Sequence, residues 1–499
     1  MSTSPQLRSL NIDNINQNVR RAQYAVRGEL ATKAEAYRAQ LKKRQYPPTP
    51  PADEDTLPFD QVISANIGNP QQLDQKPITF FRQVLSILEN PELLKNEDAL
   101  KSAFGYQDDV IARAKWLLNE VKSVGAYSAS QGAPGIRESV AKYIERRDGY
   151  PSSPDSIFLS AGASSGVNTL MNVICASPQT GILVPIPQYP LYTATLSLLN
   201  ARCVPYYLDE SSNWGTDINA IRSAYTKAKE EGTDVRAIVV INPGNPTGAS
   251  LSADDVAAVL SFAAETNLVV LADEVYQTNI FPGSPPFTSF KKSLRTLQQS
   301  PNASNKYSTL ELASLNSISK GMVGECGHRG GYFELTGFHP DVAAQIYKFV
   351  SIQLCAPVVG QCLLEMQVNP PTPGDPSYPL YKTEFDSIAT GLHDRATALY
   401  SAFEKMEGVT CQKPQGSMYL YPTITLPARA VDAAKAEGRS PDEFYCMRLL
   451  EKTGICIVPG SGFGQREGTL HFRTTFLAPG TEWVGRIVEF HEGFWGEFR

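Results

Sequence analysis

Between residues 156 and 272 the sequence alternates short apolar runs with longer stretches of helical periodicity. The apolar runs cover 156–160, 181–184, 204–208, 237–241 and 268–272, and the helical patterns cover 164–175, 191–199, 217–231 and 252–265. Strands and helices in this order form βαβ units, which build a mainly parallel sheet with helices on both faces. The run at 238–241 is apolar at every position, as expected of a strand buried on both faces. The sequence therefore predicts an α/β fold.

A smaller α+β domain is predicted after the proline-rich segment 369–376. There, a long helical pattern at 381–406 precedes short apolar runs at 418–422, 455–458 and 470–475. We therefore divide the chain into an N-terminal arm with part of the small domain (1–95), a large domain (96–375) and a C-terminal small domain (376–499).

The arm contains helix-forming residues at 11–41 and ends at the proline-rich segment 46–51. An isolated helix of this kind is marginal in water. We therefore expect the arm to pack on the body of the protein or on a partner.

The composition of the 499 residues is that of a globular protein, with 42% hydrophobic and 19% charged side chains and a formal net charge of -6. The chain has no basic excess that would suggest nucleic acid, and no apolar run of about 18 residues that would suggest a membrane helix. The eight cysteines include no C-x-x-C pair, so we expect reduced thiols and no metal site. The N-terminus lacks the apolar core of a signal peptide. We expect a cytoplasmic protein, with the mitochondrial matrix as the alternative.

A lysine next to a glycine-dense loop is the first candidate for chemistry. Lys320 follows a short β-like run, and five of the eleven residues at 321–331 are glycine. Glycine lets the backbone approach a ligand closely, and Arg329 within the loop could bind an anion through two N–H groups. The hydroxyls of Ser317 and Ser319 add possible phosphate donors. Taken alone, Lys320 could equally be a surface lysine.

Three further candidates lie where predicted strands end, which is the edge at which open α/β sheets bind ligands. Asp273 directly follows the run at 268–272, although an aspartate there could also be a helix N-cap. Asn245 lies in a turn at 242–248 with two prolines and two glycines, a rigid turn that can also be a plain loop. The segment 160–166 leads into a helix whose first amides can bind an anion. It matches neither the P-loop nor the G-x-G-x-x-G dinucleotide pattern.

The anion-binding turn, the amide, the acid and the lysine, in this order along the chain, resemble fold-type I pyridoxal-phosphate aminotransferases. The segments 126–132, 185–192, 317–332 and 458–468 resemble, more narrowly, the alanine aminotransferases. The likeness runs from about residue 11 to the C-terminus. It implies an α/β fold of type I, with a mainly parallel seven-stranded sheet in the large domain and a smaller α+β domain.

The resemblance also implies a site for pyridoxal 5′-phosphate in which Lys320 is the Schiff-base lysine. Asp273 would pair with the pyridinium nitrogen, and Tyr189 would stack on the ring. Asn245 and Tyr276 would donate hydrogen bonds to the 3′-oxygen.

By the same resemblance, the cofactor phosphate would be held by donors of this chain and by one tyrosine of a neighbouring subunit. Within the chain the donors would be the amides of Ala163 and Ser164, with Ser317 and Arg329. The neighbouring subunit of a homodimer would contribute Tyr127.

The substrate α-carboxylate would bind Arg473, helped by Asn245 and the Gly68 backbone, with Tyr189 lining the pocket. Without the resemblance, Arg473 could be a surface arginine on an edge strand. The implied partners are small amino acids and 2-oxo acids. The implied reaction is the ping-pong transfer of the amino group of L-alanine to 2-oxoglutarate, which gives pyruvate and L-glutamate. Alternatives are another pyridoxal-phosphate enzyme of this fold, such as a glutamate–glyoxylate aminotransferase or a carbon–sulfur lyase, or a non-catalytic aminotransferase-like sensor.

Overall fold

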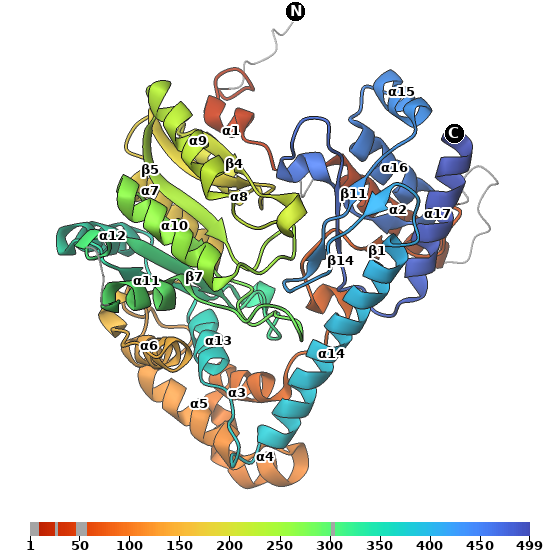
Figure 1. Ribbon diagram of the computed structural model, residues 1–499. Helices are drawn as coiled ribbons and strands as arrows, with labels where there is room; N and C mark the ends of the chain where they lie inside the picture. Colours follow the sequence, from red (N-terminus) through yellow and green to blue (C-terminus); the bar gives the residue numbers. More distant parts are fainter. Residues whose placement is uncertain (1–8, 25–27, 46–56, 301–304) are drawn as a thin grey trace, which may run out of the picture.

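The computed structural model describes residues 9–24, 28–45, 57–300 and 305–499. Figure 1 shows two lobes, which we call the sheet lobe and the C-terminal lobe, joined by the long helix α14 (Tyr378–Phe403). None of the described helices is both long enough and apolar enough to cross a membrane.

The sheet lobe is built on a seven-stranded sheet with the order β2-β8-β7-β6-β5-β3-β4. The strands are β2 (Ile157–Ser160), β3 (Thr180–Ile186), β4 (Arg202–Tyr207), β5 (Asp234–Ile241), β6 (Val269–Asp273), β7 (Leu312–Ser317) and β8 (Gly331–Thr336). Only β8 runs antiparallel to its neighbours, and the other strands of this sheet are parallel. The predicted α/β fold with a mainly parallel sheet is confirmed, and β7 and β8 extend it beyond the predicted runs.

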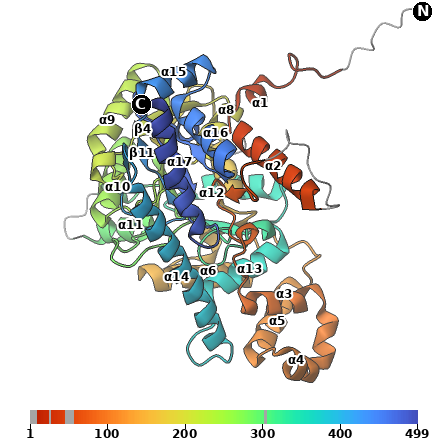
Figure 2. The same ribbon diagram turned by 90° about the vertical axis from the view of Figure 1, so that its right-hand side faces the viewer.

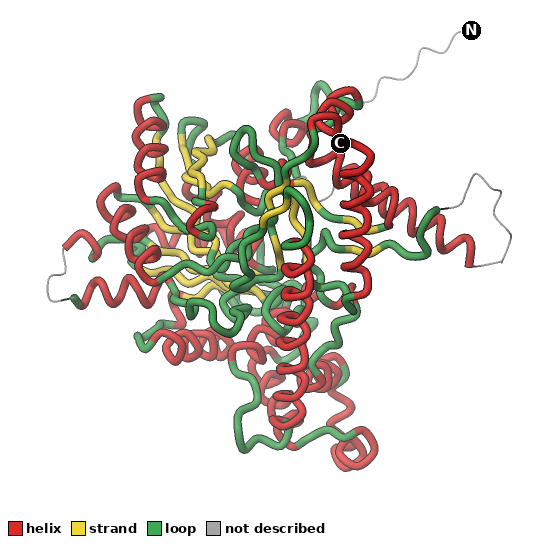
Figure 3. Tube along the Cα trace, turned by 45° about the vertical axis from the view of Figure 1, so that its right-hand side comes forward, coloured by secondary structure: helices red, strands yellow, loops and turns green. Residues whose placement is uncertain are grey.

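Helices cover both faces of this sheet, and Figure 3 shows the strands between them. One face carries α7 (Ala163–Ile174), α8 (Leu191–Leu198) and α12 (Pro340–Ile352), and the other carries α9 (Ile218–Glu230), α10 (Ala253–Thr266) and α11 (Phe290–Gln299). Side chains of β5 alternate between the two cores: Val239 packs on the first face, and Ile238 and Val240 pack on the second. This alternation explains the continuous apolar run, because both faces of the strand are buried.

A helical group packs against the edge of the sheet that carries β2 and β8. Most of this group, in orange, lies at the lower right of Figure 2. It contains α3 (Thr79–Glu89), α4 (Glu97–Phe104), α5 (Asp108–Val121), α6 (Pro134–Asp148) and α13 (Val358–Val368). The side chains of Leu159 in β2 and Tyr332 in β8 belong to its core.

The C-terminal lobe packs α15 (Ala428–Ala436), α16 (Pro441–Thr453) and α17 (Glu482–Phe498) around short strands. The strands β10 (Tyr419–Leu420), β14 (Phe472–Thr475) and β13 (Val458–Pro459) form one sheet. Two separate two-stranded sheets lie in the same lobe: β9 (Val409–Thr410) pairs with β11 (Thr423–Ile424), and β1 (Ile63–Ser64) pairs with β12 (Ile455–Cys456). The predicted strand at 455–458 is divided into β12 and β13, because the chain changes pairing partner within it. The predicted strand at 418–422 forms only the shorter β10.

The arm forms two helices, α1 (Gln17–Arg21) and α2 (Glu29–Gln45), where the sequence suggested one helical segment. The chain leaves α1 in extended conformation at Ala22 and places Tyr24 against Tyr189. Leu30 and Ala34 of α2 are buried in the core of the C-terminal lobe. The arm therefore packs on the body of its own chain, while the proline-rich segment 46–51 lies outside the described residues.

Candidate active site

A cavity of about 430 Å³ lies at the carboxyl ends of the parallel strands, where the C-terminal lobe faces the sheet lobe. Its lining includes Tyr24, Gly68, Ala163, Ser164, Tyr189, Asn245, Asp273, Tyr276, Ser317, Ser319, Lys320, Cys326, Arg329, Tyr419 and Arg473. The structure therefore brings every residue of the predicted site together except Tyr127, whose side chain is on the surface, 81% exposed.

Lys320 follows β7, and its amine lies in the cavity. The Nζ atom donates to the carbonyl oxygen of Gly68 at 2.6 Å. A Cβ on residue 68 would lie 2.9 Å from this Nζ and 2.3 Å from the hydroxyl oxygen of Tyr419. A side chain at residue 68 would therefore displace the Lys320 amine or the Tyr419 hydroxyl from these positions.

An anion-binding corner forms where Arg329 meets the start of α7. The guanidinium donates to the carbonyl oxygens of Ala161 at 2.8 Å and Cys326 at 2.9 Å, and to the Ser319 hydroxyl at 3.2 Å. Gly162 caps α7 with φ +89°, and a Cβ there would lie 2.5 Å from the guanidinium. The first amides of a helix have no intrahelical acceptor. Together with the arginine charge, the amides of Ala163 and Ser164 suit a phosphate.

Asp273 ends β6 as a buried carboxylate. The Tyr192 hydroxyl donates to it at 2.7 Å, and the backbone N–H of Val275 donates at 3.4 Å. Among the described residues no cation forms an ion pair with it. Burial raises the pKa of Asp273, and the Tyr192 hydrogen bond and the charge of Lys320 only partly oppose that effect. A cationic ligand group would remove this cost.

Arg473 is a buried guanidinium that lacks a carboxylate partner among the described residues. It donates to Asn245 Oδ1 at 3.1 Å and to the carbonyl oxygen of Asn66 at 2.5 Å. The rings of Tyr419 and Phe463 flank it, with centroids 4.3 and 4.6 Å from Cζ. A buried cation needs an anion, so this arginine is suited to a carboxylate that enters the cavity.

The sequence matches the family described as aminotransferase class I and II over residues 99–484. The chain belongs to this family. The aminotransferase is 52% identical over 493 residues to a Saccharomyces cerevisiae protein named alanine aminotransferase, mitochondrial, and the match covers 98% of this chain and 81% of the relative. It is 49% identical over 488 residues to an inactive alanine aminotransferase of the same yeast, covering 97% and 94%. Because one relative is named inactive, the family alone does not establish catalysis, which depends on the side chains of the cavity.

The aminotransferase is also similar to the solved structure of an alanine aminotransferase from Pyrococcus furiosus. The TM-score is 0.70 at 22% identity, and the match covers 96% of this chain and 100% of the other. This likeness supports the fold alone.

The family implies pyridoxal phosphate, and the cavity fits that group at three points. Asp273 offers a carboxylate without a cation to a pyridinium nitrogen. Arg329 and the start of α7 offer a phosphate corner. The amine of Lys320 lines the same cavity.

Three tyrosines of this site were missed by the sequence analysis. Tyr192 lies in the first turn of α8, and its hydroxyl donates to Asp273. Tyr24 lies in the N-terminal arm, and its hydroxyl is 2.5 Å from that of Tyr189. Tyr419 comes from a two-residue strand of the other lobe. No local pattern predicts either of the last two.

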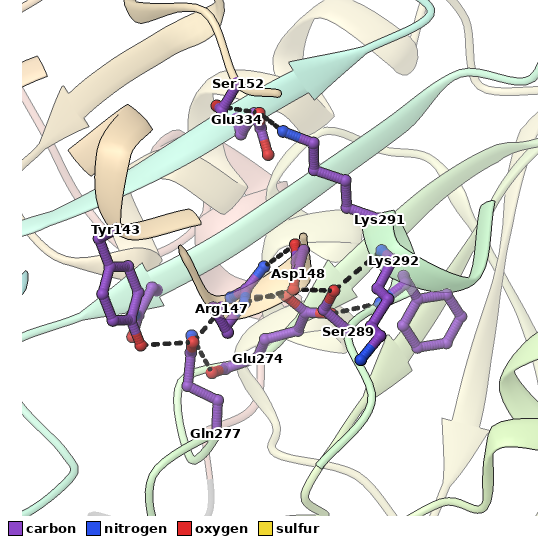
Figure 4. A network of polar contacts seen from close by, with 12 residues as sticks. Tyr143, Arg147, Asp148, Ser152, Glu274, Gln277, Ser289, Lys291, Lys292 and Glu334 are labelled. Atoms are coloured by element: carbon purple, nitrogen blue, oxygen red, sulfur yellow. Dashed lines mark hydrogen bonds and ion pairs between the residues drawn. The ribbon is translucent and has the colours of Figure 1, made fainter. Parts of the chain in front are cut away.

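A buried charge network includes Glu274, the residue that follows Asp273 in the chain (Figure 4). Arg147 binds Asp148 through two hydrogen bonds of 2.7 and 2.6 Å and lies 3.9 Å from Glu274. Lys291 pairs with Glu334 in the same network. Two cations thus face three carboxylates. Burial raises the pKa of Glu274 to about 7, against the opposing charge of Arg147.

Proposed function

We propose that this chain is an alanine aminotransferase, which transfers the amino group of L-alanine to 2-oxoglutarate and forms pyruvate and L-glutamate. The observation that carries the proposal is a single cavity that holds an amine, a carboxylate-binding arginine and a buried acid: Lys320, Arg473 and Asp273. The 52% identity to a yeast protein of that name, over nearly the whole chain, supports the choice of substrate.

When bound, the cofactor supplies a ring that accepts electrons from the substrate Cα. Asp273 would hold a proton on the ring nitrogen, since the buried carboxylate gains a cationic partner there. Asn245 and Tyr276 would donate hydrogen bonds to the 3′-oxygen. Tyr189 would lie against the ring face, and its hydroxyl is already held by Tyr24.

The phosphate would be held at the start of α7. The amides of Ala163 and Ser164 would donate to it, with the Ser317 hydroxyl and the guanidinium of Arg329. The glycine at position 162 lets that guanidinium approach the helix end.

Arg473 would bind the substrate α-carboxylate, with Asn245 already at 3.1 Å from its guanidinium. Fixing the carboxylate there orients the Cα–H bond toward Lys320. The Lys320 amine would then move the proton between Cα and the C4′ position of the cofactor. In the second half-reaction the same residues would act in reverse on 2-oxoglutarate.

Addition of L-alanine to the purified holoenzyme tests this function. We expect the absorbance of the aldehyde form of the cofactor to be replaced by that of the amine form, with pyruvate released and no ammonia. Borohydride reduction and peptide mapping should place the cofactor on Lys320. Ammonia release would indicate a lyase, preference for glyoxylate over 2-oxoglutarate would indicate a glutamate–glyoxylate aminotransferase, and label on another lysine would contradict the role of Lys320.

We further propose a homodimer in which Tyr127 reaches the phosphate corner of the neighbouring subunit. Its exposed side chain, outside the cavity of its own chain, supports this proposal. For the compartment, the names of relatives support the mitochondrial matrix rather than the cytoplasm. Fractionation of cells that produce the full-length protein would distinguish the two compartments.

A further inference from the structure

Asn279 lies in the segment between β6 and α11 that also carries Tyr276, and nothing so far gives it a role. Its side chain is 1% exposed and lies outside the lining of the cavity. Its Oδ1 atom accepts a hydrogen bond of 2.9 Å from the backbone N–H of Gly321, the residue that directly follows Lys320. The side chain of Asn279 therefore holds the chain immediately next to the lysine.

The chain at Gly321 fits closely against the segment that carries Asn279. Gly321 has a left-handed backbone with φ +70°, and a Cβ there would lie 2.7 Å from Oγ1 of Thr278. Another residue at this position would strain the turn and displace Thr278. Residues 278 and 279 thus set the path of the backbone just after Lys320, whose side chain begins one residue earlier.

The backbone of Asn279 is itself fixed on two sides. Its N–H donates to the carbonyl oxygen of Tyr276 at 2.8 Å, and its carbonyl oxygen accepts from the N–H of Ser417 in the C-terminal lobe at 2.9 Å. The next residue, Ile280, forms a β-bridge with Gly416, where a Cβ would lie 2.3 Å from the Asn279 carbonyl oxygen. Asn279 is therefore a rigid point from which a side chain can hold another segment in place.

The two ends of the Asn279 side-chain amide have unequal surroundings. The Oδ1 atom accepts from the Gly321 N–H, whereas Nδ2 is buried and has no acceptor among the described residues. A buried donor without an acceptor lowers the stability of the fold. The acceptor oxygen is therefore the part of this side chain that the structure uses.

We propose that Asn279 is a positioning residue for Lys320: its Oδ1 fixes the Gly321 N–H and thereby holds the Lys320 backbone where the amine can reach both the cofactor and the substrate Cα. The proposal rests on the function proposed above. A lysine side chain is long and flexible, so the place of its amine depends on a fixed backbone. A displacement of about 1 Å at a reacting atom can slow a reaction roughly 100-fold.

The reaction of Lys320 with the cofactor tests this role without an amino acid. In the cofactor-free protein, the amine nitrogen bonds the aldehyde carbon of pyridoxal phosphate, and the aldehyde oxygen leaves as water with the two amine protons. Stopped-flow absorbance would give the rate constant of this step. Pyridoxamine phosphate, which carries an amine in place of the aldehyde and cannot bond to lysine, would give the affinity of the same cavity as a Kd.

Asn279→Ala should lower that rate constant about tenfold or more and change the Kd of pyridoxamine phosphate less than about twofold, because only the lysine loses its support. Asn279→Asp keeps an acceptor oxygen at the same place and removes only the Nδ2 atom. It should bring the rate constant to within about threefold of wild type. With L-alanine, Asn279→Ala should lower kcat more than it changes KM, since Arg473 still binds the carboxylate.

Gln415→Ala is the matched control. The Oε1 atom of Gln415 also accepts a backbone N–H from another segment, that of Ser250 at 2.8 Å. Its carbonyl oxygen accepts from the N–H of Phe281, two residues after Asn279. The substitution therefore removes the same kind of hydrogen bond from the same junction of the two lobes, but it leaves the Gly321 N–H paired. Both the rate constant and the Kd should stay close to the wild-type values.

The outcomes separate this role from the proposed function. A slower reaction with an unchanged Kd in Asn279→Ala, but not in Gln415→Ala, supports the role of Asn279, whichever amino acid the enzyme uses. Equal rate constants in the wild type and Asn279→Ala contradict that role even if L-alanine is transaminated. A rate constant and an affinity that fall by the same factor, or an Asn279→Asp variant as slow as Asn279→Ala, also contradict it. Bond formation at a lysine other than Lys320 would instead contradict the proposed function.

Discussion

At the residue scale, Asp273 and Glu274 are neighbours in the chain with opposite surroundings. Successive side chains of an extended segment point to opposite sides. Asp273 accordingly lines the cavity, whereas Glu274 points into the charge network behind it, where it accepts a hydrogen bond from the backbone N–H of Phe290 at 2.8 Å. Both are fully buried carboxyl groups whose pKa is raised by burial. Their roles differ because a ligand can reach only one of them.

Asp273→Asn should keep the shape of the site but remove the charge that holds a proton on the ring nitrogen. We expect kcat to fall by about two to three orders of magnitude, since a preorganised charge in a dry site contributes roughly 3–4 kcal/mol. Steady-state kinetics with L-alanine would measure the loss. Asp442→Asn is the control, because Asp442 is an equally buried carboxylate that accepts from the Ser461 N–H outside the cavity. A wild-type kcat in Asp273→Asn would mean that the ring nitrogen has another partner.

Glu274→Gln should change how stability depends on pH. The pKa of Glu274 is about 7 in the folded protein and 4.5 as its reference value, so between these values the folded state binds more protons than the unfolded state. The contribution of Glu274 to the free energy of unfolding is therefore fully present below pH 4.5 and is lost as the pH rises to 7. The glutamine of the variant cannot ionise, so the variant keeps this stability. At the upper end of this pH range its free energy of unfolding should exceed that of the wild type by up to roughly 3 kcal/mol.

Urea unfolding at several pH values would measure this effect. The free energy of unfolding of Glu274→Gln, relative to wild type, should rise across that window and then level off. Glu467→Gln, on the surface, controls for removal of a charge. A difference that stays constant with pH would show that Glu274 is ionised throughout.

At the element scale, the start of α7 is shaped by the arginine that packs against it. Gly162→Ala should weaken cofactor binding, because the added Cβ would lie 2.5 Å from the Arg329 guanidinium and would displace it from the phosphate corner. We expect the cofactor Kd to rise at least tenfold, measured by absorbance or fluorescence titration of the cofactor-free protein.

Gly149→Ala is the matched control for that substitution. Gly149 also has a left-handed backbone, with φ +75°, but a Cβ there would meet nothing within 4 Å. Both variants should lose about 1–2 kcal/mol of stability from the strained backbone. Only Gly162→Ala should bind the cofactor more weakly, and equal Kd values in the two variants would contradict the steric argument.

At the scale of the whole molecule, the site exists only because two lobes face each other across it. The C-terminal lobe supplies Arg473 and Tyr419, and the sheet lobe supplies Lys320 and Asp273. A second contact joins the lobes away from the cavity: Glu210, just after β4, accepts a hydrogen bond from the Thr423 hydroxyl and lies 3.3 Å from His471 Nε2. The division of the chain at residues 95 and 375 stays a prediction, which limited proteolysis can test.

The proposed dimer predicts complementation between two impaired variants. If Tyr127 serves the neighbouring site, a hybrid of Tyr127→Phe and Lys320→Ala subunits has one site with both changes and one with neither. Mixing the two variants should restore activity toward one native site per hybrid, and sedimentation should give twice the mass of one chain. Tyr127→Phe must first prove impaired by itself. Hybrids that show only the mean of the two parents would mean that Tyr127 acts within its own chain.

The sequence by itself determined the features that depend on neighbouring positions along the chain. Periodicity predicted five strands of the sheet lobe, β2 to β6, and the four helices α7 to α10 that lie between them in the chain. The ends of these strands marked Asp273 and Asn245, because ligands bind at the carboxyl edge of a parallel sheet. The motif around Lys320 and the likeness to aminotransferases located Arg329 and Arg473.

Only the tertiary structure decided what depends on long-range packing. Tyr419 and Tyr24 reach the cavity from segments 99 and 296 residues away from Lys320 in the chain. Two-residue strands such as β10 carry no period that a sequence can show. The pairing of Tyr192 with Asp273 and the pKa of Glu274 depend on burial and on charges brought together by folding. Such effects arise from distance and dielectric surroundings in three dimensions, which the order of residues along the chain does not contain.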